Sequence, residues 1–252
     1  GPIAGTGSCC YTGDGGPALS AAIDKPWGFV VDASGRIYFK DAGQNAVREL
    51  VAGSGVPTLL GVVNGATNLS GPIAPGEVVV FYGNGLGPVQ TVQSGIQVLF
   101  NGSPGTPLYS SEFQAAAVAP GNLSGSNVEI DLSYGGLFGL PVTVPLASAA
   151  PGIFTADNSG HGQAAALNAD GSSNSAAHPA TGSITLFATG VSSPVQVTIA
   201  GVPAPVLSQN QASGVLQVTA KIPAGIGPGA VPVVMQSGGV LSPTGVSIVV
   251  GP

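Results

Sequence analysis

Short runs of β-forming residues recur along the chain, and glycine, proline and asparagine separate them. Runs of four to eight such residues between turn residues are typical of β-strands with at least one buried face. The clearest run follows Pro75, where Glu77–Tyr82 leads into Gly83-Asn-Gly-Leu-Gly87 and Pro88. This stretch predicts one buried strand that enters a tight corner.

The segment around this strand predicts an antiparallel sandwich. Asn64-Gly65, Asn84-Gly85 and Asn101-Gly102 are strong tight-turn dipeptides. One strand with its turn takes about 8 to 12 residues, which is the spacing of such sandwiches. Besides Glu77–Tyr82, the pattern predicts strands at Ile96–Phe100, Thr106–Tyr109, Phe113–Val118, Asn127–Tyr134 and Leu140–Leu146.

The same order of elements returns about one hundred residues later. Thr181–Pro194 is similar to Pro75–Pro88, and Val195–Pro203 is similar to Ile96–Pro104. A third match follows at Val231–Gly239, which is similar to Val128–Gly136. Matched segments in one order indicate tandem copies of one domain.

The first 55 residues follow a different pattern. Trp27–Asp32 and Arg36–Lys40 are predicted strands around the turn Ala33-Ser-Gly35, and a third strand, Ala46–Val51, follows. A lone unit of this kind leaves open edges and apolar faces, which invite pairing with the rest of the chain or with another copy. The side chains expected to serve this assembly are Trp27, Phe29, Ile37 and Phe39, together with Cys9 and Cys10.

Two family resemblances follow from these residues. Residues 12 to 52 resemble one NHL repeat, the unit that forms a blade of a β-propeller. Residues 61 to 250 resemble the IPT/TIG branch of immunoglobulin-like folds, and more narrowly a paired C-terminal module of secreted bacterial proteins, which implies this fold and export but no activity. The likeness rests on Val63–Ala66, Ile73–Val78, Gly83–Pro88, Ala150–Phe154 and Gly201–Pro205.

The expected fold is therefore all-β, with a blade-like N-terminal segment and two tandem immunoglobulin-like sandwiches. The expected boundaries are 1–55 for the N-terminal segment, 56–149 for the first sandwich, 150–162 for a linker and 163–252 for the second sandwich. The boundary near Gly53–Pro57 also marks a shift in charge, because four of the five basic residues precede it.

The small number of charged residues and the net negative charge limit the kinds of partner that the protein can bind. Only 6% of the 252 residues are charged and the net charge is −6, whereas ordinary soluble domains are roughly 25% charged. No basic stripe exists that could neutralise phosphates, which excludes nucleic acid as a partner. No apolar run reaches the roughly 18 residues of a membrane span. Such a surface fits either a secreted protein solubilised by neutral polar residues or one covered by neighbouring subunits or sugars.

Few residues are candidates for disulfide formation, catalysis or metal binding. Cys9 and Cys10 are adjacent, so they form a vicinal disulfide, form disulfides to another copy, or stay unpaired. His161, Asp157 and a serine supply the residue types of a Ser-His-Asp triad, but the sequence contains no Gly-x-Ser-x-Gly motif, so a catalytic triad is not predicted. The central carboxylates are Glu77, Glu112, Glu129 and Asp131, of which Glu129 and Asp131 share one strand face and fit a solvated sandwich face better than a pair of glycosidase acids. The aspartates of the N-terminal turns fit bonds to their own backbone, with calcium binding as the less favoured alternative; they are Asp14, Asp24, Asp32 and Asp41.

The sequence thus predicts a non-enzymatic, extracellular cell-surface protein with no cofactor and no metal. Its expected partners are other copies of itself, joined into a homopolymeric filament by β-strand pairing through the N-terminal segment. The alternative is a secreted adhesive module that binds surface polysaccharide or protein, with Tyr82, Tyr109, Tyr134 and Phe138 as the candidate aromatic residues.

Overall fold

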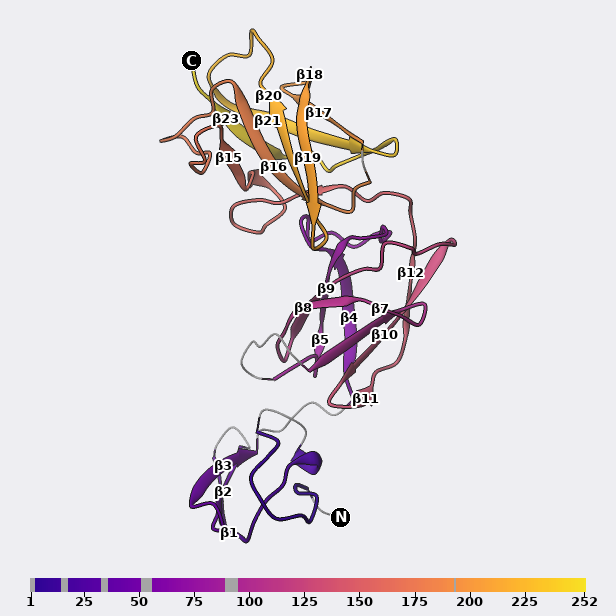
Figure 1. The fold of residues 1–252 in the computed structure, drawn as a ribbon, viewed down its shortest axis with the longest axis vertical. Coiled ribbons are helices and arrows are strands. Elements are labelled where there is room, and N and C mark those ends of the chain that lie inside the picture. Colours follow the sequence, from indigo (N-terminus) through magenta and orange to yellow (C-terminus); the bar gives the residue numbers. More distant parts are fainter. Residues whose placement is uncertain (1–2, 15–17, 33–35, 51–55, 89–94, 193) are drawn as a thin grey trace.

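The computed structural model of the protein describes residues 3–14, 18–32, 36–50, 56–88, 95–192 and 194–252. They form three β-rich units that follow one another along the chain (Figure 1). The predicted turn Ala33–Gly35 and most of the predicted boundary near Gly53 lie outside the described residues. Within the described ranges, no helix has the length and apolar character needed to cross a membrane.

The N-terminal unit, residues 3–50, is a three-stranded antiparallel sheet covered on one face by the preceding chain. The strand order is β1-β2-β3, and each predicted strand is confirmed to within about one residue. The sheet is open, and the described residues contain no closed propeller, so the NHL-type propeller expectation is not supported. The elements are η1 (Ala18–Ser20), β1 (Pro26–Val31), β2 (Ile37–Asp41) and β3 (Ala46–Leu50).

Sandwich 1 packs a four-stranded sheet, β4-β5-β9-β8, against a sheet built on β10 and β6. Phe81 of β5 and Phe100 of β6 meet in the core with ring centroids 6.3 Å apart. The strand predicted after Pro75 is confirmed as β5, and its corner begins at Gly85, which has φ 72°. The strands are β4 (Thr58–Asn64), β5 (Val78–Asn84), β6 (Ile96–Phe100), β7 (Ser103–Pro104), β8 (Thr106–Ser110), β9 (Gln114–Val118), β10 (Asn127–Tyr134), β11 (Leu137–Phe138) and β12 (Val142–Pro145).

Sandwich 2 repeats this plan around its own core. The antiparallel pair β17 and β21 corresponds to β6 and β10, and β16 corresponds to β5. Residues 150–162, expected to be a linker, contribute β13 and the first residue of β14 to this unit. The strands are β13 (Gly152–Ile153), β14 (Gly162–Gln163), β15 (Ala166–Asn168), β16 (Ser183–Thr189), β17 (Val195–Ile199), β18 (Val202–Ala204), β19 (Val206–Ala212), β20 (Val215–Lys221), β21 (Gly229–Ser237), β22 (Val240–Leu241) and β23 (Val246–Val250).

The two sandwiches are joined by direct hydrogen bonds. The Thr189 hydroxyl accepts a bond from the Val78 N–H and donates one to the Gly214 carbonyl oxygen, both at 2.7 Å. The Asn64 side-chain amide donates to the Ala150 carbonyl oxygen at 2.9 Å. Because these bonds are buried or partly buried, they hold the sandwiches more firmly than a solvated linker would.

Candidate assembly surface

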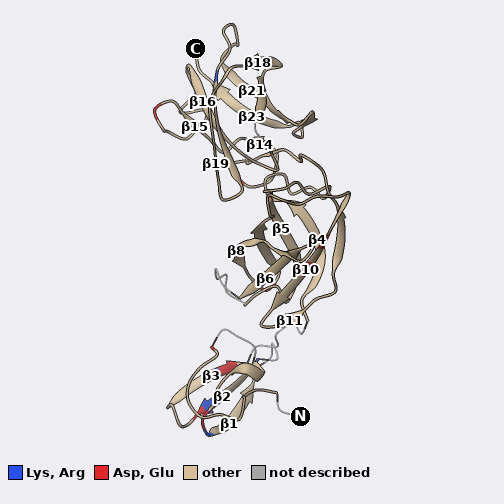
Figure 2. Ribbon diagram, turned by 45° about the vertical axis from the view of Figure 1, so that its right-hand side comes forward, with Lys and Arg blue, Asp and Glu red and all other residues tan. Residues whose placement is uncertain are grey.

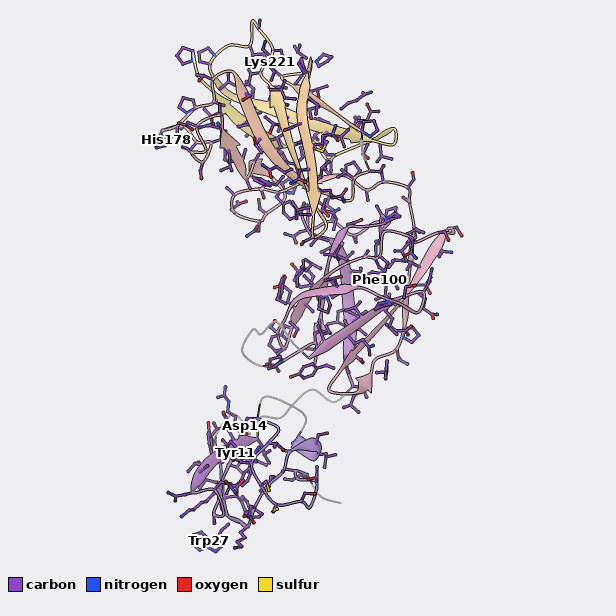
Figure 3. All side chains as sticks on the ribbon, in the orientation of Figure 1. Tyr11, Asp14, Trp27, Phe100, His178 and Lys221 are labelled. Atoms are coloured by element: carbon purple, nitrogen blue, oxygen red, sulfur yellow. The ribbon has the colours of Figure 1, made fainter. Side chains whose placement is uncertain are left out.

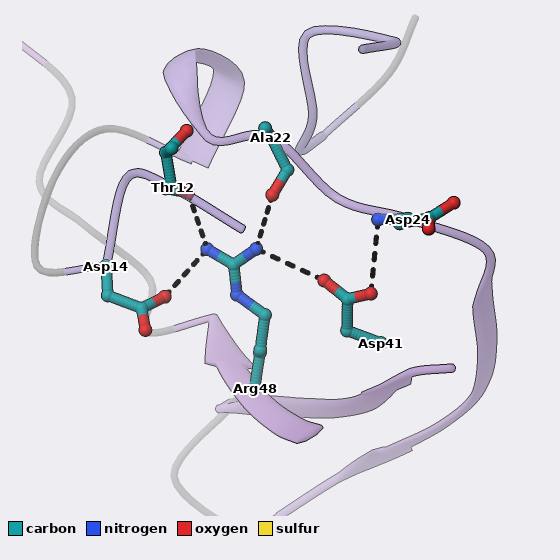
Figure 4. Close-up of polar contacts among 6 residues, drawn as sticks. All are labelled: Thr12, Asp14, Ala22, Asp24, Asp41 and Arg48. Carbon is teal, nitrogen blue, oxygen red and sulfur yellow. Dashed lines mark hydrogen bonds and ion pairs between the residues drawn. The ribbon is translucent and has the colours of Figure 1, made fainter. Parts of the chain in front are cut away.

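A buried arginine fixes the covered face of the N-terminal sheet. Arg48 of β3 donates to the carbonyl oxygens of Thr12 and Ala22 at 3.0 and 2.6 Å (Figure 4). It also pairs with Asp14 at 2.7 Å and with the fully buried Asp41 at 3.4 Å. One planar guanidinium therefore ties the chain before β1 to β2 and β3, as its fork of five donors allows.

The turn carboxylates Asp14 and Asp41 therefore have structural roles. Asp41 also accepts a hydrogen bond from the Asp24 N–H at 3.1 Å, and the Arg48 guanidinium lies 4.9 Å from the centre of the Tyr11 ring. No group of three or more Asp, Glu, His or Cys side chains among the described residues is arranged to hold a metal ion. Asp14 and Asp41 therefore neutralise a buried arginine at these turns.

A bulge at Gly28 puts Trp27 and Phe29 on opposite faces of the sheet. Trp27 pairs with Lys40 and Phe29 pairs with Phe39, so Gly28, at φ 62°, is the extra residue. In a regular strand, two residues at i and i+2 share a face. The bulge therefore divides the two aromatic side chains between the faces.

On the covered face, the predicted assembly residues differ in exposure. Phe39 is buried, at 9% exposure, and Ile37 is half-buried, whereas Phe29 at the sheet edge is 75% exposed. They border an apolar hollow of about 260 Å³ that the preceding chain helps to enclose. Phe39 therefore contributes core rather than contact surface. The hollow is lined by Ile3, Ala4, Ile23, Pro26, Phe29, Ile37, Phe39 and Leu50.

The opposite face, called the outer face here, carries exposed apolar side chains together with the charged residues Lys40 and Glu49. Trp27 is 75% exposed, and Val30 and Val47 are exposed to 67% and 74%. Strand register places Trp27, Lys40 and Val47 in one row and Val30, Tyr38 and Glu49 in the next. Val30 and Val47 were not predicted as contact residues, although the alternation in β3 could have identified Val47 as the partner of Lys40.

Cys9 and Cys10 are exposed reduced thiols in the structure. Their Sγ atoms lie 3.1 Å apart, and no disulfide joins them. The contact with Cys9 raises the pKa of the Cys10 thiol. Cys10 has φ 97°, a conformation that is uncommon for a residue with a side chain. The two thiols lie outside the apolar rows of the sheet.

The residues considered for a serine triad do not form one. The Ser159 hydroxyl lies 2.7 Å from Asp157 Oδ1, and His161 Nδ1 lies 3.2 Å from the Ser159 carbonyl oxygen. The imidazole therefore contacts the backbone rather than the hydroxyl that it would have to activate. The hydrogen bonds to Ser159 lower the pKa of Asp157, as expected for a turn carboxylate.

The four central carboxylates have different environments. Glu129 is exposed and Asp131 and Glu112 are half-buried, but Glu77 is only 1% exposed. Glu77 Oε2 accepts a hydrogen bond from the Ala74 N–H at 2.7 Å. Burial raises the pKa of Glu77 to about 8, and the hydrogen bonds from Ala74 and the Asn64 side chain oppose that rise.

No family model matches the sequence, and no curated protein matches it. Among solved structures, a surface glycan-binding protein from Bacteroides ovatus is 16% identical, with a TM-score of 0.36 and coverage of 86% of this chain and 51% of that chain. Domains 5–6 of the S-layer protein SbsC are 14% identical, with a TM-score of 0.31 and coverage of 77% and 98%.

The extracellular region of plexin A4 is 12% identical, with a TM-score of 0.32. The chain spans 19% of that protein's length, and 51% of the length of the glycan-binding protein. Similarities at this level assign no family, and the β-sandwich architecture rests on the strand pairing of this chain itself.

Proposed function

We propose that the protein is a non-enzymatic extracellular structural subunit, which assembles into a surface filament through its N-terminal unit. The observation that carries this proposal is the outer face, where Trp27, Val30 and Val47 are all more than 60% exposed. Several exposed apolar side chains on one face of a small unit mark a candidate interaction site. The adjacent sandwiches serve as a stiff spacer between successive contacts.

The surface chemistry of the rest of the chain supports this proposal. Figure 2 shows basic residues mainly in the N-terminal unit, and residues 56–149 contain none. With charged residues at 6% of the chain, electrostatic repulsion between copies is weak. Main-chain and apolar contacts are then the main means of association.

The outer face suits this contact better than the free edge of β1 does. The sequence favours strand pairing, but β1 begins at Pro26 and contains the bulge at Gly28. Proline and bulges are features that hinder edge-to-edge pairing. We therefore assign the contact to side chains of the outer face rather than to the edge of β1.

The test compares assembly of the purified full chain with that of a variant carrying Trp27→Ser and Val47→Ser. The proposal expects filaments in negative-stain images of the wild type and their loss in the variant. Leu207→Ser is the matched control, because Leu207 is an exposed apolar residue of β19 in sandwich 2. Undiminished filaments from the double variant would show that assembly does not use the outer face.

Polysaccharide binding is the second candidate, and one observation favours it. Tyr82 and Tyr109 lie on the same outer surface of the β5-β9-β8 sheet, because strand register aligns them with Gln114 and Ala116. The Tyr82 hydroxyl lies 3.4 Å from Gln114 Nε2. Tyrosine rings beside amide groups suit a neutral sugar. Binding on a glycan array that Tyr82→Ala abolishes, in a protein that stays monomeric, would favour this function over assembly.

A further inference from the structure

Cys9 and Cys10 are the only cysteines of the sequence, and the proposed assembly contact does not involve them. Their Sγ atoms lie 3.1 Å apart, and both residues are exposed. Since a disulfide bond is about 2.05 Å long, an approach of about 1 Å separates this pair from a covalent bond. The two side chains therefore form a dithiol that solvent and small molecules can reach.

The backbone at Cys10 brings the two sulfur atoms together. In an extended chain, the side chains of neighbouring residues point to opposite sides. Cys10 instead has φ 97°, and within the described stretch 3–14 it is the only residue other than glycine with a positive φ. Such a conformation is strained for a residue with a Cβ atom, and backbone strain of this kind is concentrated at functional sites.

The loop that carries the pair is held at both ends. Before the pair, the Thr6 N–H donates to the Ala21 carbonyl oxygen at 2.9 Å. After the pair, the Thr12 carbonyl oxygen accepts a hydrogen bond from the Arg48 side chain at 3.0 Å. The strained conformation at Cys10 therefore belongs to an anchored loop rather than to a free chain end.

The pair lies away from the outer face. Tyr11 follows Cys10 directly, and the guanidinium of Arg48 lies 4.9 Å from the centre of its ring. Figure 3 shows Tyr11 beside Asp14, with which it makes a hydrogen bond, and shows Trp27 at the other end of the N-terminal unit. A reaction at the dithiol and a contact through the outer face therefore involve separate parts of this unit.

Other uses of the pair fit the structure less well. In the part of the chain that the structure describes, no third Cys, His, Asp or Glu joins the two thiols to hold a metal ion. A disulfide between neighbouring residues closes almost no loop, so it would add little to the stability of the fold. A bridge to another copy would compete with a thiol only 3.1 Å away, and reactions between groups held together are strongly favoured over reactions between molecules.

We propose that Cys9 and Cys10 form a redox-active dithiol, which small-molecule disulfides oxidise to a vicinal disulfide within one copy. This inference goes beyond the proposed function and does not depend on it. The ring that closes between neighbouring residues is constrained, and strained, exposed disulfides are the ones that are readily reduced again. The pair is therefore a reversible redox site rather than a structural bridge.

The reaction takes two exchange steps. One cysteine, as its thiolate, attacks a sulfur atom of the small disulfide; the S–S bond of that disulfide breaks, one small thiolate leaves, and a mixed disulfide remains. The second cysteine loses its proton to water and attacks the protein sulfur of the mixed disulfide, which releases the other small thiolate. In total, the protein gives up two electrons and two protons, and the small disulfide is reduced to two thiols.

The electrostatics of the pair support this order of steps. The pKa of Cys10 is raised, chiefly by its hydrogen bond with Cys9, and the charges of Cys9 and Asp24 add to the rise. A second negative charge so close to the first is unfavourable, so the reduced pair reacts as one thiolate and one thiol. Once the first sulfur is part of a neutral mixed disulfide, that repulsion is gone and the second thiol ionises more readily.

The test treats the full chain with an excess of oxidised glutathione, quenches with acid, blocks the remaining thiols and measures intact masses over time. The wild type is expected to lose the mass of two hydrogen atoms, to carry no glutathione and to remain a covalent monomer on a non-reducing denaturing gel. Cys9→Ser and Cys10→Ser should each stop at the mixed disulfide with one glutathione bound, because the second thiol is missing.

A shifted pair is the matched control for the backbone argument. Ser8→Cys combined with Cys10→Ser keeps two adjacent cysteines, but neither position 8 nor position 9 has a positive φ. Ser8 is exposed, so the substitution disturbs no buried side chain. The mixed disulfide of the shifted pair should close roughly 10- to 100-fold more slowly than that of the wild type, because the two sulfur atoms are not held together.

Four results would overturn the inference. Covalent dimers as the main product of the wild type would show that the cysteines bridge two copies. Stable addition of two glutathione molecules, or no reaction at all, would show that the pair is not a redox-active dithiol. Equally fast closure in the shifted pair would show that the conformation at Cys10 does not prepare the site.

Discussion

The buried carboxyl group of Glu77 gives the stability of sandwich 1 a pH dependence that one substitution should remove. Glu77 precedes β5 directly, next to Val78, whose N–H bonds to Thr189 of sandwich 2. Its pKa rises from the ordinary value of 4.5 to about 8, chiefly because burial disfavours the charged form. Glu77→Gln keeps an oxygen that can accept the hydrogen bond from Ala74 but cannot ionise.

The sign follows from the protons bound in each state. Between pH 4.5 and 8 the folded protein holds a proton on Glu77 that the unfolded chain has released. The stabilising contribution is therefore complete below pH 4.5 and is lost as the pH rises to about 8, above which it stays lost. From pH 4.5 to pH 7 the loss amounts to about 3 kcal/mol, at 1.36 kcal/mol per pH unit.

The assay is the free energy of unfolding by urea, followed by far-UV circular dichroism from pH 4.5 to pH 8. The difference between wild type and Glu77→Gln should change by about 3 kcal/mol between pH 4.5 and pH 7, in favour of the variant at higher pH. The exposed Glu129 provides the control, because Glu129→Gln should give a difference of less than about 0.5 kcal/mol throughout. A constant difference for Glu77→Gln would refute the reasoning, as would an NMR titration of its carboxyl carbon near pH 4.5.

Two further substitutions test the contacts that hold the units together. Arg48→Met leaves the carboxylate of Asp41 buried without its partner and should destabilise the N-terminal unit by about 3 to 5 kcal/mol, measured as lost hydrogen-exchange protection in β2. Thr189→Val leaves the Val78 N–H without its acceptor and should cost about 1 to 3 kcal/mol. Small-angle scattering should then show a wider range of inter-sandwich angles, whereas Thr185→Val, within sandwich 2, should leave that range unchanged.

The repeated strands could be predicted from the sequence because their signals are local. Asn84-Gly85 and Asn101-Gly102 set the turns at the ends of β5 and β6, and Gly102 has φ 75° in the structure. The inward positions of β6 and β17 show the same burial pattern, so the internal repeat reflects a shared core. Local turn chemistry and alternation are sufficient for such elements.

β4 could not be predicted in the same way. Leu59-Leu60-Gly61-Val62-Val63 is a continuous apolar run without alternation, and the bulge at Leu60 shifts its register against β5. A run of this kind does not distinguish a buried strand from other buried segments. β4 is therefore the strand of sandwich 1 that the sequence pattern reveals least.

Contacts with a neighbouring segment of the chain explain several of the residues that depart from the expected pattern. Glu77 is a carboxylate at the start of a strand of buried apolar residues, and it is itself buried beside the joint with sandwich 2. Arg48 and Asp41 are charged residues in a small sheet, and they are buried because the chain before β1 covers them. In each case a neighbouring segment explains the exception.

The outer face is an exception of the opposite kind, and the same reasoning applies to it. Trp27 and Val47 are large apolar side chains on either side of Lys40, yet no described segment of the chain covers them. Within one chain, exceptions of the first kind are explained by a neighbouring segment. Apolar side chains that remain exposed in the single chain are then best explained by a neighbour from another copy, which is why the assembly experiment above varies the outer face.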